Sequence, residues 1–174
     1  MLTRAETKYL AAIPKDRTVR ICPFDAVKVE RISESIVERV RKRVTEVWEI
    51  KFLGASALGI AGQKDIDVFL LCPADSFKLY LPSLTREFGQ PKPWKTRQPS
   101  IDWEWEEDGY AVELSLTSPH SPATRRQLKV LELLQKDPAL LAEYGRLKQG
   151  FDGKGYHDYQ KAKYGFYNRM LKEG

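Results

Sequence analysis

The chain has 174 residues, of which 42% are hydrophobic and 30% charged, a composition typical of a globular protein and unlike a disordered or fibrous chain. This length supports one hydrophobic core, so we expect a single domain over residues 1–174. The lack of a long apolar run or a secretory signal predicts a cytoplasmic protein without a membrane partner. The formal net charge of +5 suits phosphate-bearing ligands but does not indicate a DNA-binding protein.

The first half of the chain predicts one helix, two strands and the turn between them. Residues 28–45 place apolar side chains three and four apart, which predicts an amphipathic helix. Residues 47–53 are rich in aromatic and branched side chains and predict a strand, followed by a turn and a short helix over 54–62. Residues 65–71 are apolar enough for a strand in the middle of a sheet.

The middle of the chain predicts a further helix and a hairpin. Residues 76–88 fit a helix, although we expect Pro82 to kink it or to begin a new one. Residues 101–106 and 110–116 alternate apolar and polar side chains around Glu107-Asp108-Gly109, which is a hairpin signal. Two more strands follow from this pattern.

The C-terminal part predicts three helices. The first begins at Pro122, and Asp137-Pro138 marks the N-cap and first turn of the second, which runs through Leu147. The third covers residues 156–170. The expected fold class is α+β, close to α/β, with a mixed sheet of about four or five strands flanked by helices. Within the single domain, an α/β core over 19–118 would carry a C-terminal helical subdomain over 122–172.

Two aspartates on the 65–71 strand are the leading candidates for a functional site. Because side chains alternate along a strand, Asp65 and Asp67 project from the same face and can bind one hard cation. Mg²⁺, or Mn²⁺, would relieve their mutual repulsion and could bridge to nucleotide phosphates. We therefore predict that both aspartates are metal ligands and catalytic residues.

Such a site needs a third carboxylate from a neighbouring strand, and Glu113 is the candidate. The residues on either side of Glu113 are apolar and point into the core, so Glu113 and Ser115 lie on the opposite face. Glu104 and Glu106 are alternatives, since they alternate with tryptophans in the same way. Glu113 is accordingly predicted as a catalytic and metal-binding residue.

The nucleotide phosphates are predicted to lie against the turn that precedes the aspartates. Gly54 offers backbone N–H groups and Ser56 a hydroxyl near the start of a short helix, where anions bind readily. Three lysines of the C-terminal helices could also bind the phosphates or stabilise the pyrophosphate leaving group, with a solvent-exposed helix face as the alternative. They are Lys148, Lys161 and Lys163.

Some aromatic and histidine side chains near these candidates have simpler explanations. Tyr156 and Tyr159 could stack on a nucleobase, although aromatic residues at helical spacing are more often part of a core. His120 and His157 are expected to be polar surface residues rather than general bases, because neither lies in a recognisable catalytic setting.

The cysteines and the densest basic run are expected to be structural. Cys22 and Cys72 have neither the spacing of a disulfide framework nor that of a zinc site, so we expect reduced packing residues. The basic run over residues 39–43 lies in the first predicted helix and is expected to form a solvated helix face.

The order of these segments resembles the nucleotidyltransferase superfamily of DNA polymerase β. The fingerprint of that superfamily is Gly-Ser, then Asp-x-Asp, then a carboxylate on a later strand. Asp65-Ile66-Asp67 and Val112-Glu113-Leu114 match its second and third parts. Gly54-Ala55-Ser56 departs from the first part, because an alanine separates the glycine from the serine.

Nearly the whole chain, from Val19 to Leu171, is similar to the GrpB family within that superfamily. The resemblance is carried by residues 21–25, residues 54–67, and the C-terminal segments 137–148 and 159–163. The chain has Asp65 where many members carry an apolar residue, and its glycine loop lacks the proline common there. The resemblance implies a nucleotidyltransferase fold and leaves the substrate open.

The residues and the resemblance together predict a metal-dependent nucleotidyltransferase. The donor would be a nucleoside triphosphate, with ATP expected, and the acceptor a small molecule, an RNA or a protein. One alternative is a non-catalytic nucleotide- or RNA-binding module, which the position of Glu113 relative to Asp65 and Asp67 would distinguish. A second is an antitoxin-like partner protein, which a large exposed apolar patch on the terminal helices would favour.

Overall fold

The computed structural model describes residues 2–44, 49–93 and 100–173. One sheet is formed by β1 (Glu49–Leu53), β2 (Asp65–Leu71), β3 (Ser100–Glu107) and β4 (Tyr110–Thr117). The helices are α1 (Arg4–Ala11), α2 (Ala26–Arg43), α3 (Gly54–Ala57), α4 (Phe77–Phe88), α5 (Pro122–Lys136), α6 (Pro138–Gly150) and α7 (Tyr156–Glu173), and a 3-10 turn (Ala74–Ser76) precedes α4.

The sheet is mixed, with the strand order β1-β2-β4-β3. β2 and β4 pair in parallel at its centre, while β1 and β3 are antiparallel edge strands. The β3–β4 hairpin turns at Asp108 and Gly109, which have φ angles of 52° and 77°. Two successive residues with positive φ are what a tight two-residue hairpin requires. The mixed sheet confirms the predicted fold class.

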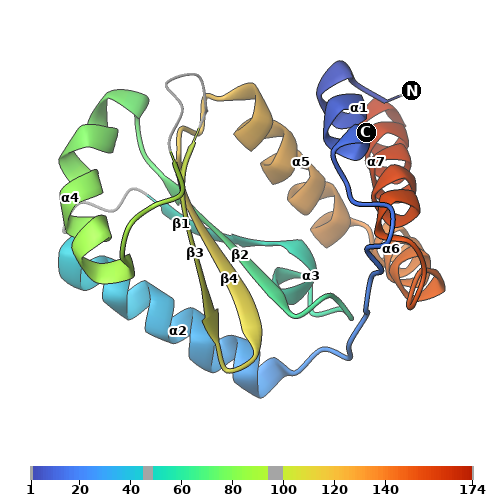
Figure 1. Cartoon of the computed structure of the whole chain (residues 1–174), viewed down its shortest axis with the longest axis horizontal. Helices are drawn as coiled ribbons and strands as arrows, with labels where there is room; N and C mark the ends of the chain where they lie inside the picture. The colour runs from blue at the N-terminus through green and yellow to red at the C-terminus, as the bar shows by residue number, and fades with distance from the viewer. Residues whose placement is uncertain (1, 45–48, 94–99, 174) are drawn as a thin grey trace.

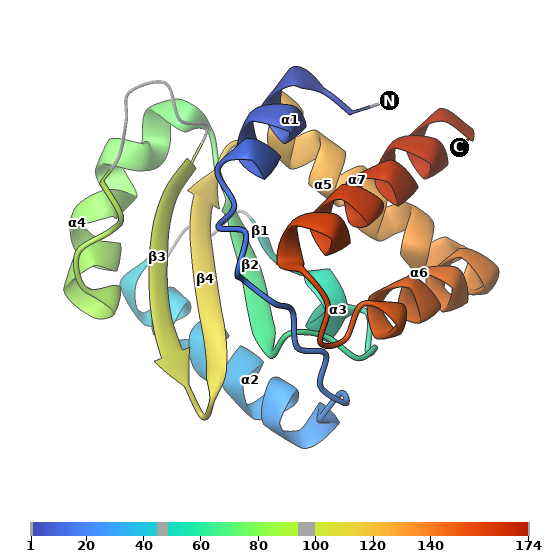
Figure 2. The same ribbon diagram turned by 45° about the vertical axis from the view of Figure 1, so that its right-hand side comes forward.

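The two faces of the sheet are covered by different sets of helices (Figures 1 and 2). α2 and α4 cover one face, where Ile32, Ile36, Trp103 and Leu114 are fully buried in the main core. α5 lies against the other face, and α6, α7 and α1 lie beyond it. A second core between α5, α6 and α7 reaches back to Leu58 after α3. The side chains of β2 and β4 that do not enter the main core therefore point toward the C-terminal helices.

Most predicted elements occur where expected. The Asp25 carboxylate caps α2 by accepting a hydrogen bond from the Lys28 N–H at 3.1 Å, and Asp137 caps α6 in the same way. The predicted strand 47–53 appears from Glu49 onward, since residues 47 and 48 lie outside the described residues. α4 continues through Pro82 and does not restart there.

The sequence interpretation did not include α1, which long-range contacts hold in place. Its N-cap residue Thr3 forms a capping box with Glu6. Glu6 is 7% exposed and accepts hydrogen bonds from Arg126 of α5 at 2.8 Å and from Asn168 of α7 at 3.0 Å. This buried carboxylate joins the first helix to the C-terminal helices.

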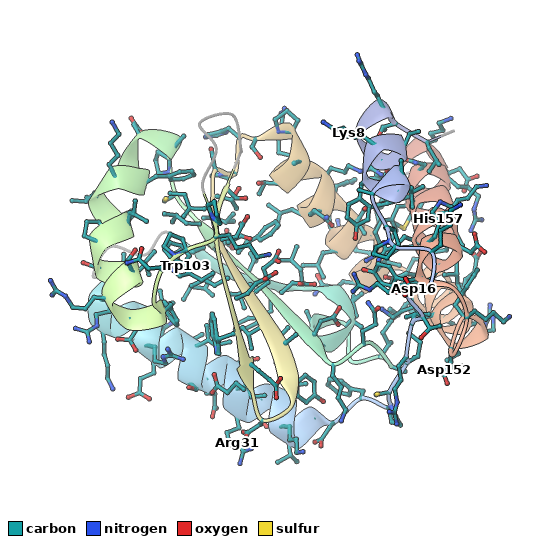
Figure 3. All side chains as sticks on the ribbon, in the orientation of Figure 1. Lys8, Asp16, Arg31, Trp103, Asp152 and His157 are labelled. Atoms are coloured by element: carbon teal, nitrogen blue, oxygen red, sulfur yellow. The ribbon has the colours of Figure 1, made fainter. Side chains whose placement is uncertain are left out.

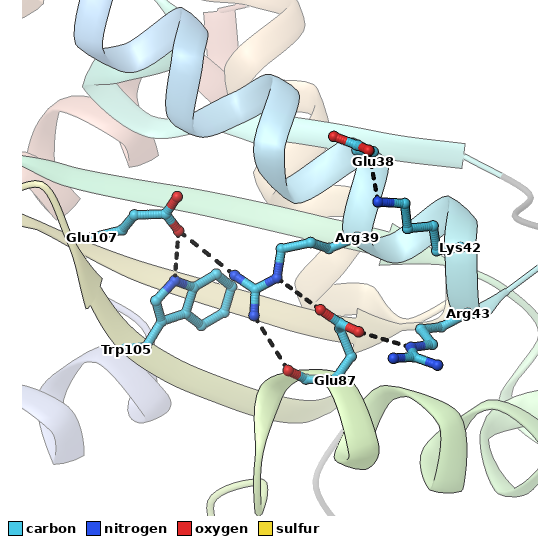
Figure 4. Close-up of polar contacts among 7 residues, drawn as sticks. All are labelled: Glu38, Arg39, Lys42, Arg43, Glu87, Trp105 and Glu107. Atoms are coloured by element: carbon cyan, nitrogen blue, oxygen red, sulfur yellow. Dashed lines mark hydrogen bonds and ion pairs between the residues drawn. The ribbon is translucent and has the colours of Figure 1, made fainter.

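The basic run of α2 is only partly the solvated face that we expected. Arg39 donates to the Glu87 carboxylate at 3.0 Å, lies 3.7 Å from Glu107 and stacks on Trp105 (Figure 4). Its guanidinium also lies over the ring of Phe88. Arg43 bonds the same Glu87, so α2 is joined to both α4 and β3. The prediction from charge alone was wrong for Arg39, because its partners lie in distant segments.

Both cysteines are free, and Cys72 is buried while Cys22 is half-buried. This agrees with their expected role as reduced packing residues. Within the part of the chain that the structure describes, no helix combines the length and the apolar character needed to cross a membrane.

Candidate functional site

A row of carboxylates crosses the sheet on the face toward the C-terminal helices. The strand registers place Asp67 of β2 beside Glu113 of β4, and Glu113 beside Glu104 of β3. Asp65 precedes Asp67 by two residues and so points from the same face. Neighbouring strands lie about 4.8 Å apart, so Asp67 and Glu113 are close neighbours while Glu104 is one strand farther away. The structure thus brings the predicted residues onto one face.

The Asp67 carboxylate packs against the turn at Gly54. A methyl group added to Gly54 would lie 2.7 Å from Asp67 Oδ2, and Gly54 itself has a φ of 72°. Only glycine satisfies both conditions easily. Burial raises the pKa of Asp67 to about 6, and the charge of Asp65 acts in the same direction, while Lys163 and Lys148 oppose it. A side chain at position 54 would therefore both strain the backbone and displace the Asp67 carboxylate.

Glu113 is held in a three-residue contact with Glu104 and Lys92. The Lys92 ammonium lies 3.2 Å from Glu113 Oε2 and also bonds Glu104. Burial raises the pKa of Glu113 to about 7, with help from the hydrogen bond to Glu104 and the charge of Asp67, while Lys92 opposes the shift. Burial also acts against ionisation of Glu104, but the hydrogen bond from Glu113 and the contact with Lys92 outweigh it and lower the pKa of Glu104. Glu113 is therefore the member of this pair that holds a proton more readily.

The fit of a metal ion to this row is mixed. Among the described residues, no group of three or more His, Cys, Asp or Glu side chains is arranged closely enough to hold a metal ion. Mg²⁺ in nucleotide-dependent enzymes, however, is commonly bound by one or two carboxylates together with waters and substrate phosphates. The two carboxylates of Asp65 and Asp67, on one face of β2, suit such a site, in which phosphates would supply the remaining oxygen ligands.

Two lysines from the C-terminal helices lie next to these aspartates. Lys148 of α6 is 2% exposed, with its ammonium 5.2 Å from the ring centre of Tyr144. A methyl group added to Gly62 would lie 3.9 Å from Lys148 Nζ and 3.7 Å from Asp65 Oδ1, so the lysine and the aspartate meet across this glycine. Burial lowers the pKa of Lys148 to about 8, and Lys163 adds to the effect, while Asp65 and Asp67 oppose it.

Lys163 of α7 also lies near these aspartates and lines the cavity with Asp67. Its burial disfavours the charged form, but the surrounding tyrosines and Asp65 outweigh this and raise the pKa of Lys163. Within the described chain, neither Lys148 nor Lys163 forms a hydrogen bond or a close ion pair. The buried hydroxyl of Tyr159 also lacks a hydrogen-bond partner there, and its ring centre lies 5.9 Å from Lys148 Nζ. Two ammonium groups and a hydroxyl thus have free donors beside the aspartates.

Other predicted phosphate-binding residues are less favourably placed. Lys161 is exposed on the face of α7 opposite to Tyr159 and Lys163, so the structure does not bring it to the aspartates. The Ser56 hydroxyl faces its own backbone, with the Leu53 carbonyl oxygen 3.5 Å away. α3 contains only four residues, so its N-terminus supplies a small dipole.

The tyrosine and histidine expectations agree with the structure. Tyr156 and Tyr159 are buried with Val19 in a small core, as helical spacing indicated. His120 is exposed. His157, near the start of α7 (Figure 3), has 45% of its side chain exposed and contacts Asp158 at 3.1 Å. Neither histidine is positioned to act at the carboxylate row.

A cavity of about 270 Å³ opens between this face of the sheet and helices α5 and α7. Gly54, Asp67, Glu113 and Lys163 line one part of it, while Asp65 lies outside its lining. The sequence interpretation did not single out Lys92 or Asp102, which also lines the cavity. Strand alternation could have indicated Asp102, since it lies on the same face as Glu104, whereas no local pattern reveals the contacts of Lys92.

The comparisons with known proteins support the fold. GrpB from Enterococcus faecalis superposes with a TM-score of 0.66 at 15% sequence identity, and the match covers 88% of this chain and 98% of that chain. No protein-family model matches the sequence, and a search of curated proteins gives no match. The predicted GrpB-like fold is confirmed by this structural likeness.

Proposed function

Starting from a chain with the fold of GrpB, we propose that it transfers a nucleotidyl group from a nucleoside triphosphate, with ATP as the first candidate, to an acceptor hydroxyl. The observation that carries this proposal is that Asp67 and Glu113 lie on neighbouring strands and line one cavity together with Lys163, while the buried Lys148 ammonium lies near Asp65 and Asp67. Such a mixture of charges suits a ligand that brings both a cation and phosphates.

The residues have separate roles in this proposal. Lys148 and Lys163 would bind the phosphates, and the Tyr159 hydroxyl could donate to them. Asp65 and Asp67 would hold Mg²⁺ or Mn²⁺, which neutralises phosphate charge when bound. The acceptor oxygen forms a bond to the α-phosphorus, the bond from that phosphorus to the α–β bridging oxygen breaks, and pyrophosphate leaves with the electron pair. Glu113, beside Asp67 in the cavity, accepts the hydroxyl proton.

The main alternative is a module that binds a nucleotide or RNA without transferring a group. One observation favours it: Glu113 is already engaged by Lys92 and Glu104. An antitoxin-like partner protein has less support, because the large exposed hydrophobic residues of the described chain do not come from α5, α6 or α7. They are Tyr9, Phe24, Val27 and Leu79.

The enzyme and the binding module are distinguished by measuring nucleotidyl transfer and nucleotide binding on the same proteins. The protein is incubated with each labelled triphosphate and Mg²⁺, and label transfer, pyrophosphate release and equilibrium binding are measured for the parent, Asp67→Ala and Asp16→Ala. Asp16 is exposed and serves as the matched control. Transfer that Asp67→Ala abolishes and Asp16→Ala retains would support the enzyme. Binding without release of pyrophosphate would support the module, and identical release by all three proteins would refute the catalytic role of Asp67.

A further inference from the structure

The cavity continues along the sheet beyond the carboxylate row. One step along the strands, Ser115 of β4 lies beside Asp102 of β3, and one step farther Thr117 lies beside Ser100. Each step is two residues, or about 6.8 Å. α5 covers this second end with Thr124 and Gln127. The cavity therefore has a distinct polar end that the nucleotide site does not use.

The second end is built from buried groups with a defined hydrogen-bond arrangement. The Ser115 hydroxyl is 4% exposed and donates to Asp102 Oδ1 at 2.7 Å. The hydroxyls of Thr117 and Thr124, both 2% exposed, lie 2.7 Å apart. A carboxylate can accept several hydrogen bonds, so Asp102 retains acceptor capacity toward the cavity after binding Ser115.

The charges at this end select the kind of ligand. Among the described residues that line the cavity, Lys163 is the only cation, and it lies at the Asp67 end. Asp102 therefore has no lining cation beside it and would repel a phosphate or carboxylate, while attracting an ammonium group. Phe69, Val130 and Leu131 form an apolar wall suited to a short carbon chain.

We propose that the second end of the cavity binds a small amino alcohol, with its ammonium group on Asp102 and its hydroxyl directed toward Asp67 and Glu113. The row that holds Asp67 and Glu113 lies one two-residue step from the row that holds Ser115 and Asp102. This distance matches the length of a hydrogen bond, about 2.8 Å, plus a short carbon chain. The cavity volume of about 270 Å³ is just below the range of roughly 300–1,000 Å³ typical of ligand pockets, which favours a small acceptor. The role of this molecule as acceptor rests on the proposed nucleotidyl transfer, but its binding does not.

The test uses ethanolamine as the probe, with glycerol and glycolate as uncharged and anionic comparisons. Binding is followed by chemical-shift titration of the backbone amides of residues 102, 115 and 124 in the full chain. Ethanolamine should bind saturably and at least tenfold more tightly than glycerol, and glycolate should not bind. Equal shifts from ethanolamine and glycolate would overturn the proposal.

Two variants and a control make the assignment specific. Asp102→Asn should weaken ethanolamine binding at least tenfold, whereas Asp16→Asn should leave it unchanged. Gln127→Lys places a cation at an exposed position of α5 and removes no buried contact. It should weaken ethanolamine binding and create glycolate binding. Parent-like binding of ethanolamine by both Asp102→Asn and Gln127→Lys would refute the site.

The same titration with and without Mg·ATP separates this proposal from the proposed function. Ethanolamine binding by a chain that does not bind ATP would support the second site and refute the nucleotidyltransferase proposal. ATP binding and pyrophosphate release without ethanolamine binding would refute the second site alone. Formation of a nucleotidylated ethanolamine, lost in Asp102→Asn, would support both.

Discussion

Replacement of Gly54 by alanine tests the close packing between the turn and Asp67. The variant carries two penalties. A φ of 72° costs a non-glycine residue about 1–2 kcal/mol, and the new methyl group would lie 2.7 Å from Asp67 Oδ2, well inside van der Waals contact. The carboxylate must therefore move. Gly153 has a φ of 73° but nothing within 4 Å of an added methyl group, so Gly153→Ala carries the first penalty without the second.

We expect Gly153→Ala to lower the free energy of unfolding by about 1–2 kcal/mol and the melting temperature by roughly 2–4 °C per kcal/mol. Gly54→Ala should lose measurably more stability and should also change the pKa of Asp67. The assays are chemical denaturation and NMR titration of the Asp67 carboxyl carbon. Equal losses of stability in the two variants, together with an unchanged Asp67 titration, would refute the packing argument.

Three further predictions concern single side chains. The raised pKa of Asp67, about 6, means that the folded chain binds this proton more tightly than the unfolded chain and loses stability as the pH rises through 6. In metal-free buffer Asp67→Asn should thus raise the free energy of unfolding by roughly 3 kcal/mol at about pH 8 and by little at about pH 4. An equal gain at both pH values would contradict the shift. Arg39→Ala should lower the free energy of unfolding in urea by roughly 1–2 kcal/mol, whereas Arg31→Ala, at an exposed position, should lower it by less than about 0.5 kcal/mol. Equal losses in the two variants would argue against a stabilising contact between α2 and α4. Burial raises the pKa of the Cys72 thiol to about 11. A thiol reagent at about pH 8 should therefore modify Cys22 in the native chain and Cys72 only after unfolding. Fast reaction of both thiols would show that Cys72 is accessible.

The fold could largely be predicted because its elements carry local signals. The apolar run of β2, the alternation around the Asp108-Gly109 turn and the Asp137 N-cap each act within a few residues. α1 carries a local signal in the capping box of Thr3 and Glu6, but the helix has only eight residues and is held in place by contacts of Glu6 with α5 and α7, more than a hundred residues away. The same reason explains the incorrect interpretation of Arg39.

For the candidate site, strand periodicity was enough to place Asp65, Asp67 and Glu113 on one face. It could not decide among the lysines, because the side of a helix that faces the sheet depends on how the helix packs. Packing buries Lys148 and leaves Lys161 exposed. The predicted coordination of one metal by all three carboxylates finds no preassembled group of three in the part of the chain described by the structure, so the proposed function gives the metal to Asp65 and Asp67 and the proton to Glu113.

The division of the acidic residues between β2 and β4 also bears on how the site responds to local opening. These two strands pair in parallel at the centre of the sheet, and a parallel pair forms only after the chain between them has folded back. Central strands open least often in native proteins, with free energies near that of global unfolding. Amide hydrogens of β2 and β4 should accordingly exchange among the slowest in the molecule, and ligands would meet carboxylates on a backbone that is already rigid before they arrive.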